Sequence, residues 1–357
     1  MESLLIPLAL LVGGLLAVQA AANLQLSAAV GSPVGASTLQ LAIGAVLLTA
    51  LAGVVGTLAA VGLLPGAEPW HLLGGLGSAI YITAGILLFP RLGALVSVGL
   101  FVTGQMLASL VLDSFGLLGL GRTGLDPAAA VGALAVITGI VIVVRAQVTP
   151  AKVQPQPVAV ATARVTAAEE PPAQVTAAQV RPGQVRGAAA AASRGGAVAM
   201  TRRRIERRAG WVLLGLLAGA ALPLQGAVNA QLRADLGAPV TVGAFSFATA
   251  TATMAVVLLA LLALRRVPRP RVAPLRDLPW WGWLGGFVGA TYVVAVFLLI
   301  PEIGAAATIG LTVAGQQLAS LLVDQFGLLR LPRRPLTRAR LAGVALLLAG
   351  VALIQLT

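Results

Sequence analysis

The sequence predicts an all-α integral membrane protein with ten transmembrane helices in two inverted five-helix repeats. Three observations predict this fold: an apolar composition, ten continuous apolar runs, and ordered matches between the two halves of the chain. Of the 357 residues, 58% are hydrophobic and only 10% are charged, and the mean hydropathy is +0.96. A soluble domain is normally about a quarter charged, so this composition suits lipid better than water.

Each apolar run is long enough to cross a bilayer as a helix. A hydrocarbon core of about 30 Å needs roughly 20 residues at about 1.5 Å of rise each. Because the runs are continuous rather than alternating, they predict helices and not the strands of a barrel. The ten predicted spans are 4–22, 36–63, 70–89, 93–112, 127–144, 210–230, 240–264, 280–300, 303–323 and 339–356.

The stretch 146–208 separates the two predicted repeats, which cover 1–145 and 209–357. It is rich in Ala, Pro, Gln, Val and Arg and has no sustained apolar face, so it is predicted to be a disordered, basic cytoplasmic linker. It ends in the basic cluster Arg202–Arg208, directly before a predicted span. Such a cluster is typical of a segment attracted to anionic lipid, and we favour that interpretation over nucleic-acid binding.

The two halves share the same motifs in the same order. Gln-x3-Asn-x-Gln-Leu begins at Gln19 and again at Gln225. Gly-Gln-x-Leu-Ala-Ser begins at Gly104 and Gly315, and Asp-x-Phe-Gly-Leu-Leu begins at Asp113 and Asp324. Since each unit has an odd number of spans, the second unit enters the membrane from the opposite side. The duplication therefore predicts inverted repeats related by a twofold axis in the membrane plane.

Positive charge gathers on one side of the predicted topology. Of the 24 Lys and Arg residues, all but Arg122 and Arg233 fall on the side of the linker. The positive-inside rule then places the linker in the cytoplasm and both termini outside, in the inner (plasma) membrane of a bacterium. The formal net charge of +13 is thus interpreted as a topology signal and not as a sign of nucleic-acid binding.

With these motifs in both halves, the chain resembles the YdcZ-like branch of the drug/metabolite transporter superfamily, as a fused duplicate of a five-helix unit. The resemblance covers everything except the linker and implies a ten-helix inner-membrane transporter of the kind described as an exporter. More distantly, the chain resembles the small multidrug resistance proteins, which carry a glutamate in the first helix. Here Gln19 and Gln225 occupy the polar first-helix positions, which argues against proton-coupled export of cationic drugs.

Polar side chains inside the spans are the candidates for a solute site, because burying them in lipid is costly. Gln105 and Gln316 lie near the middle of repeat-related spans, and Gln317 adds a second amide where the first half has Met106. An amide both donates and accepts hydrogen bonds, which suits a neutral or zwitterionic solute. The alternative is that these amides join helices, a contribution of about 1 kcal/mol each.

A second polar set lies toward the end of the first span of each half. Residues four apart share a helical face, so Gln19 with Asn23, and Gln225 with Asn229, either line a vestibule or cap helices. Tyr81 and Tyr292 lie inside the third span of each half. The predicted substrate-binding residues are therefore Gln105, Gln316, Gln317, Gln19, Asn23, Gln225, Asn229, Tyr81 and Tyr292.

The sequence argues against enzymes and ATP-driven pumps. It has no cysteine and only one histidine, His71, which excludes thiolate nucleophiles and multi-histidine metal sites. It has no Walker A motif, and no cofactor is predicted. The predicted function is secondary transport of a small metabolite or drug-like solute by alternating access. A channel-like or structural membrane protein and a lipid-modifying enzyme are the alternatives, and a homodimer stays open as an assembly.

Overall fold

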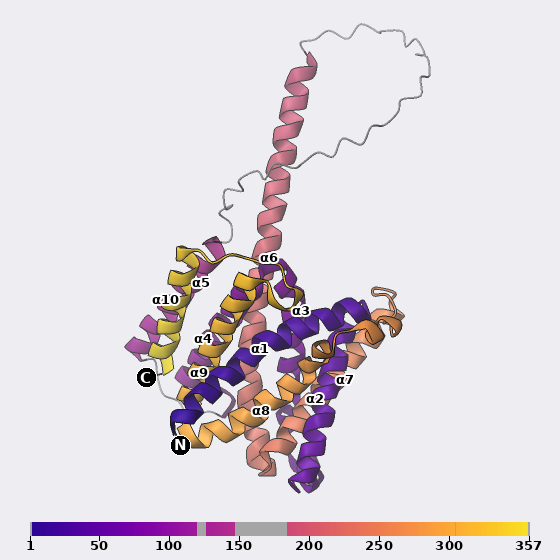
Figure 1. Ribbon diagram of the computed structural model, residues 1–357, viewed down its shortest axis with the longest axis vertical. Coiled ribbons are helices and arrows are strands. Elements are labelled where there is room, and N and C mark those ends of the chain that lie inside the picture. Colours follow the sequence, from indigo (N-terminus) through magenta and orange to yellow (C-terminus); the bar gives the residue numbers. More distant parts are fainter. Residues whose placement is uncertain (1, 120–125, 147–183, 304, 356–357) are drawn as a thin grey trace. The chain divides into compact units, whose positions relative to one another are not determined.

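The computed structural model describes residues 2–119, 126–146, 184–303 and 305–355, which form ten α-helices and no β-strand (Figure 1). In the first half these are α1 (Glu2–Val30), α2 (Pro33–Val54), α3 (Gly75–Leu92), α4 (Ala94–Phe115) and α5 (Pro127–Ala146). In the second half they are α6 (Gln184–Leu236), α7 (Pro239–Ala263), α8 (Leu284–Ile303), α9 (Ala305–Phe326) and α10 (Arg338–Gln355). Short 3-10 helices join several of them, including η1 (Leu58–Gly66) and η2 (Pro69–Leu73).

Seven helices in the described residues are long and apolar enough to cross a membrane, judged by length and composition. They are the helices α1 to α7 in whole or part, and a shorter apolar helix, Trp280–Val296, includes the first part of α8. Large apolar side chains are exposed along them, including Val46 at 68% and Leu217 at 59%. Contiguous exposed apolar surface of this kind is avoided in water, so an all-helical membrane fold is confirmed.

The last part of the segment predicted as a disordered linker is helical. The two five-helix halves form one compact unit, from which the described part of the segment between them, 184–210, is separate. Residues 147–183 lie outside the described residues, but from Gln184 the chain is already in α6. The reason is local, because this part of the segment is rich in Ala and Arg, which are among the strongest helix formers.

Helix boundaries follow the local chemistry of the chain. The helices α1 and α2 are separated at Gly31, whose φ of +79° favours glycine. Ser32 then caps α2 by accepting a hydrogen bond from the Gly35 amide at 3.3 Å, and Pro33 occupies the first turn. The same break recurs between α6 and α7, where Gly237 has a φ of +62° and Pro239 begins the helix.

Packing between the halves is reciprocal. Gly315 of α9 lies against the backbone of Leu10 in α1, and its repeat partner Gly104 of α4 lies against the backbone of Leu216 in α6. In both places the space admits no Cβ, as is typical of closely crossing membrane helices. The pairs α2 with α7 and α5 with α10 also lie side by side (Figure 1). Each of these contacts joins one half to the equivalent helix pair with the halves exchanged.

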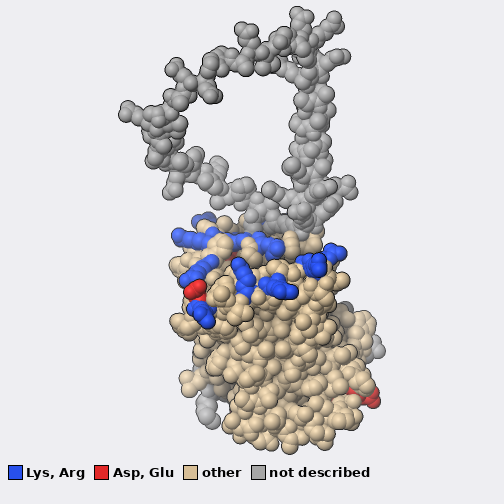
Figure 2. Space-filling model, turned by 90° about the vertical axis from the view of Figure 1, so that its right-hand side faces the viewer, with Lys and Arg blue, Asp and Glu red and all other residues tan. Residues whose placement is uncertain are grey.

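The distribution of charge on the described helices is uneven. Figure 2 shows Lys and Arg gathered in a band toward one end of the visible face, with an almost uncharged surface below it. Exposed members of the basic set include Arg265 and Arg266 after α7, and Arg333 after α9. In the predicted topology these positions share the side of the linker.

Candidate functional site

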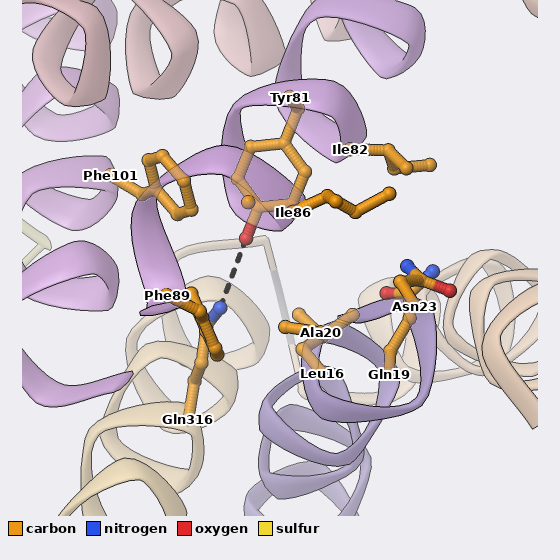
Figure 3. Close-up of a pocket in the computed structure, with 11 residues that line it drawn as sticks. Leu16, Gln19, Ala20, Asn23, Tyr81, Ile82, Ile86, Phe89, Phe101 and Gln316 are labelled. Carbon is orange, nitrogen blue, oxygen red and sulfur yellow. Dashed lines mark hydrogen bonds between the residues drawn. The ribbon is translucent and has the colours of Figure 1, made fainter. Parts of the chain in front are cut away.

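A pocket lies where α1, α3 and α4 of the first half meet α9 of the second (Figure 3). Its lining comprises Leu16, Gln19, Ala20, Asn23, Tyr81, Ile82, Gly85, Ile86, Phe89, Phe101 and Gln316. The cavity volume is about 20 Å³, which is room for a water molecule. A site for a small organic solute usually has about 300 Å³ or more, so the pocket is too small for such a solute in this structure.

One wall of the pocket joins the two halves through a hydrogen bond. The Gln316 amide donates from Nε2 to the Tyr81 hydroxyl at 3.0 Å. Gln316 is 3% exposed, and the Tyr81 ring packs on Phe101 with centroids 4.7 Å apart. The bond connects α3 to α9, so any separation of these helices breaks it (Figure 3).

The opposite wall carries the first-helix polar pair. The amide ends of Gln19 and Asn23 project from α1 into the same side of the pocket (Figure 3). They pack on glycines of α8: Asn23 Oδ1 lies against Gly285, and Gln19 Nε2 lies against Gly289. Among the described residues, neither amide makes a side-chain hydrogen bond, and Asn23 Oδ1 is buried without a partner.

The repeat-related pair on α6 has different surroundings and is not part of this pocket. Ser78 donates to Gln225 Oε1 at 2.9 Å. Ser246 accepts from both amides, from Gln225 Nε2 at 3.5 Å and from Asn229 Nδ2 at 3.2 Å. These serines therefore pair with most of the side-chain polar atoms of Gln225 and Asn229. The equivalent atoms of Gln19 and Asn23 have no such partners among the described residues.

The remaining predicted residues also lie outside the pocket lining. Tyr292 is within hydrogen-bonding reach of Thr312 and lies near Tyr81. Gln105 is partly buried on α4. Gln317 is fully buried beside Gly99, and both of its amide atoms lack a partner in the described structure. The structure thus brings together Gln19, Asn23, Tyr81 and Gln316 and keeps the other predicted residues apart from them.

Sequence reasoning missed the apolar lining and one polar neighbour. Phe89 and Phe101 carry no signal, since in a membrane helix they are indistinguishable from lipid-facing residues. Gln40 of α2 is fully buried, and its Nε2 donates to the Gly285 carbonyl at 3.4 Å beside Asn23. A glutamine within an apolar run was a usable signal, but its repeat partner is Ser246, so the search for shared motifs passed over it.

Comparison with known proteins identifies the family. Residues 4–142 and 210–353 match the family model described as "Putative inner membrane exporter, YdcZ". The chain belongs to the YdcZ family. The resemblance predicted from the motifs is confirmed, and the family and the apolar helices place this YdcZ protein in the inner membrane as a transporter.

Two further comparisons add only the fold. No match was found among curated proteins. A solved structure described only as "Crystal structure of protein" is similar over 99% of this chain and 96% of its own, with a TM-score of 0.51 and 19% sequence identity. At that identity the similarity shows that the two chains share a fold.

A buried carboxylate of the second half, paired with an arginine of the same half, joins the start of α4 in the first half of this YdcZ protein. Asp324, at the end of α9, is 1% exposed and accepts from Arg340 Nη2 at 2.6 Å. It also accepts from the backbone amides of Ala94 and Leu95 at 2.9 and 3.3 Å, at the start of α4. A carboxylate at a helix N-terminus is favourable for both partners. We call Asp324, Arg340 and the start of α4 the α9–α4 latch.

The loop after α9 strengthens this latch. Arg340 donates to the carbonyls of Arg334 and Pro335 at 2.9 and 3.0 Å. The Arg334 side chain packs on Gly93 and lies 3.4 Å from the carbonyls of Pro90 and Arg91. Burial lowers the pKa of the Arg334 guanidinium from its usual value, and the neighbouring Asp324 carboxylate opposes this shift.

A second contact between the halves lies at the other end of α3. His71 Nδ1 is 2.5 Å from Asp235 Oδ2, at the end of α6. His71 is 7% exposed and its ring lies edge-on to Trp70, with centroids 4.2 Å apart. Nearby, Leu232 and Leu236 of α6 pack with Leu72. The pairing of His71 with a carboxylate of the other half was not predicted from the sequence.

Proposed function

We propose that this YdcZ protein is a secondary transporter that exports a small metabolite or drug-like solute by alternating access. The observation that carries the proposal is the pocket itself, in which polar groups from both halves meet within an apolar, lipid-exposed helical unit. Buried polar groups in membrane helices are costly and mark solute pathways.

The proposed mechanism is a rocking of one set of helices against the other. The cavity of about 20 Å³ has to enlarge before it can hold a solute. The α9–α4 latch holds the two halves together at one end of α3, and the pairing of His71 with Asp235 holds them together at the other end. Opening one end at a time exposes the pocket to one side of the membrane, and separating α3 from α9 then breaks the Gln316–Tyr81 bond at a cost of about 1 kcal/mol.

The same proposal includes ten membrane-crossing helices in two inverted five-helix repeats. The reciprocal glycine contacts of Gly315 and Gly104 support it, because they require equivalent crossings in each half. The band of Lys and Arg supports a cytoplasmic linker with both termini outside. The contact of Arg202–Arg208 with anionic lipid, and a homodimer, stay predictions.

Topology can be tested by cysteine labelling, since the chain has no native cysteine. A membrane-impermeant maleimide is expected to label Glu2→Cys and Thr357→Cys in intact cells. It is expected to label Lys152→Cys only after the membrane is opened, which serves as the matched control. Labelling of Lys152→Cys in intact cells, or protection of either terminus, contradicts the inverted arrangement.

The transport function is tested by solute flux into proteoliposomes. The panel contains amino acids, nucleosides, sugars, organic acids and quaternary ammonium compounds. Gln316→Ala removes a pocket amide and the bond to Tyr81, so at least a tenfold loss of flux is expected, about 1.4 kcal/mol. The repeat-related Gln105→Ala, outside the pocket lining, is expected to lose less than threefold.

Equal losses of flux in the two variants would show that the solute site is not this pocket. Absence of saturable flux for every solute in the panel contradicts the transporter proposal itself. A steady, unsaturable leak favours a channel-like protein instead.

A further inference from the structure

The chain contains two repeat-related polar clusters that differ in how well their atoms are paired. The α1 cluster comprises Gln19 and Asn23 of α1 and Gln40 of α2, packed on Gly285 and Gly289 of α8. The α6 cluster comprises Gln225 and Asn229 of α6 and Ser246 of α7, packed on Gly74 and Ser78 of α3. One cluster can therefore serve as an internal reference for the other.

The backbone geometry of the two clusters is the same. Asn23 Oδ1 lies against Gly285, and Asn229 Oδ1 lies against Gly74, each so closely that a Cβ on the glycine would overlap the oxygen. Within the described part of the chain, both asparagine oxygens lack a hydrogen-bond partner. The close crossing of α1 with α8 is therefore matched by that of α6 with α3. This crossing accounts for the positions of the asparagine oxygens, so no ligand has to be invoked for them.

The clusters differ at two positions that supply hydroxyl groups. Ser78, which donates to Gln225, is replaced in the α1 cluster by Gly289. Ser246, which accepts from Gln225 and Asn229, is replaced there by Gln40. The α1 cluster therefore lacks both hydroxyls that pair the amides of the α6 cluster.

The consequence is a set of buried amides without protein partners. Among the described residues, Gln19 and Asn23 make no side-chain hydrogen bond although they are 6% and 3% exposed. Gln40 is fully buried, and its Oε1 has no partner in the part of the chain that the structure describes. An unsatisfied buried polar group costs about 1–3 kcal/mol. The unpaired Gln19 and Asn23 are also the ones that face the pocket (Figure 3).

We propose that the α1 cluster, and not the α6 cluster, recognises the solute, and that the solute is uncharged and presents an N–H donor beside a carbonyl acceptor. This inference rests on the proposed transport function and specifies its site. In the pocket, the solute's N–H and carbonyl groups pair with the amides of Gln19 and Asn23. The α6 cluster holds its helices together through Ser78 and Ser246.

The chemistry of the lining supports this class of solute. The Gln19 amide offers donors and an acceptor, and Asn23 adds the donor Nδ2, because its Oδ1 is packed against Gly285. Residues four apart on α1 present these groups from one face. Among the residues that the structure describes, no charged side chain lines the pocket, so an ionised solute would be buried without a counter-charge, at high cost. Phe89, Phe101 and Ile86 supply an apolar and aromatic surface for the rest of the molecule.

The test exchanges the hydroxyl positions between the clusters. Gly289→Ser with Gln40→Ser gives the α1 cluster the pairing residues of the α6 cluster. A Cβ on Gly289 would lie 2.8 Å from Gln19 Nε2, which is the far end of a flexible side chain and can shift. The matched control is the reverse exchange, Ser78→Gly with Ser246→Gln.

Binding is measured as the shift in melting temperature of the purified full-length protein. The probes are benzamide and uracil, each compared with its N,N-dimethyl or 1,3-dimethyl analogue. A ligand that binds the native state raises its melting temperature by mass action. Wild type is expected to be stabilised by the N–H probes and not by the methylated analogues.

The two double variants are expected to separate stability from recognition. The α1-cluster exchange is expected to weaken probe affinity at least tenfold while the melting temperature without ligand stays equal or rises, because new hydroxyls pair the free amides. The α6-cluster exchange is expected to lower the melting temperature without ligand and to change probe affinity less than threefold.

Several results would overturn the inference. Equal loss of affinity in both variants places recognition on both clusters, and equal binding of the methylated analogues removes the donor requirement. A lack of stabilisation by either N–H probe rejects the solute class. If another solute in the flux panel is still transported, the inference fails and the transport function stands; without any saturable flux, both fail.

Discussion

Asp324→Asn is expected to lower the free energy of unfolding by about 3–5 kcal/mol, the usual cost of breaking a buried ion pair. The substitution preserves the shape of the side chain but removes its charge. Arg340, which is 3% exposed, is left as an unpaired buried cation, and the start of α4 loses its anionic partner. The measurement is thermal unfolding in detergent, followed by intrinsic tryptophan fluorescence.

The repeat-related Asp113→Asn provides the control, because Asp113 is exposed. Its effect is expected to stay below about 1 kcal/mol, as for most exposed charges. Replacing both latch residues, by Asp324→Asn with Arg340→Gln, is expected to recover part of the loss, since no buried charge is then left alone. Equal destabilisation by Asp324→Asn and Asp113→Asn would show that the latch contributes little.

Gly315→Ala is expected to force α1 and α9 apart and to destabilise the protein by about 1–3 kcal/mol or more, the usual cost of overpacking. A Cβ at this position overlaps the carbonyl oxygen of Leu10. Backbone atoms cannot move aside as a side chain can, so the crossing itself has to widen. Thermal unfolding together with the yield of folded, monodisperse protein measures the effect.

Gly226→Ala is the matched control for this glycine. It adds the same methyl group to α6 at an exposed position with nothing within 4 Å. Here alanine is expected to be neutral or stabilising by about 0.5–1 kcal/mol through its higher helix propensity. Comparable losses in the two variants would contradict the close crossing of α1 and α9.

The sequence predicts the repeat well because the repeat is carried by short motifs at fixed spacing. The blocks that begin at Gly104 and Gly315 prove to be the crossing points between halves. The start of α6 was harder to predict, because an Ala- and Arg-rich segment without an apolar face satisfies the criteria for a linker and still has high helix propensity.

The candidate site shows the limit of repeat-based reasoning. Gln105 and Gln316 are equivalent in the sequence, yet only Gln316 lines the pocket, where it meets Tyr81. Tyr292 instead lies in hydrogen-bonding reach of Thr312. Such differences arise from partners on other helices, which the spacing within one span does not encode. The pairing of His71 with Asp235 was missed for the same reason.

Side-specific labelling of one cysteine in the pocket tests alternating access most directly. Ala20 lines the pocket on α1, and Leu217 is 59% exposed on α6. A membrane-impermeant maleimide is expected to label Ala20→Cys from outside in intact cells and from the cytoplasmic side in inverted vesicles. It is expected to leave the lipid-facing control Leu217→Cys unlabelled from both sides. Labelling of Ala20→Cys from one side alone, or from neither, under any solute gradient would contradict the account.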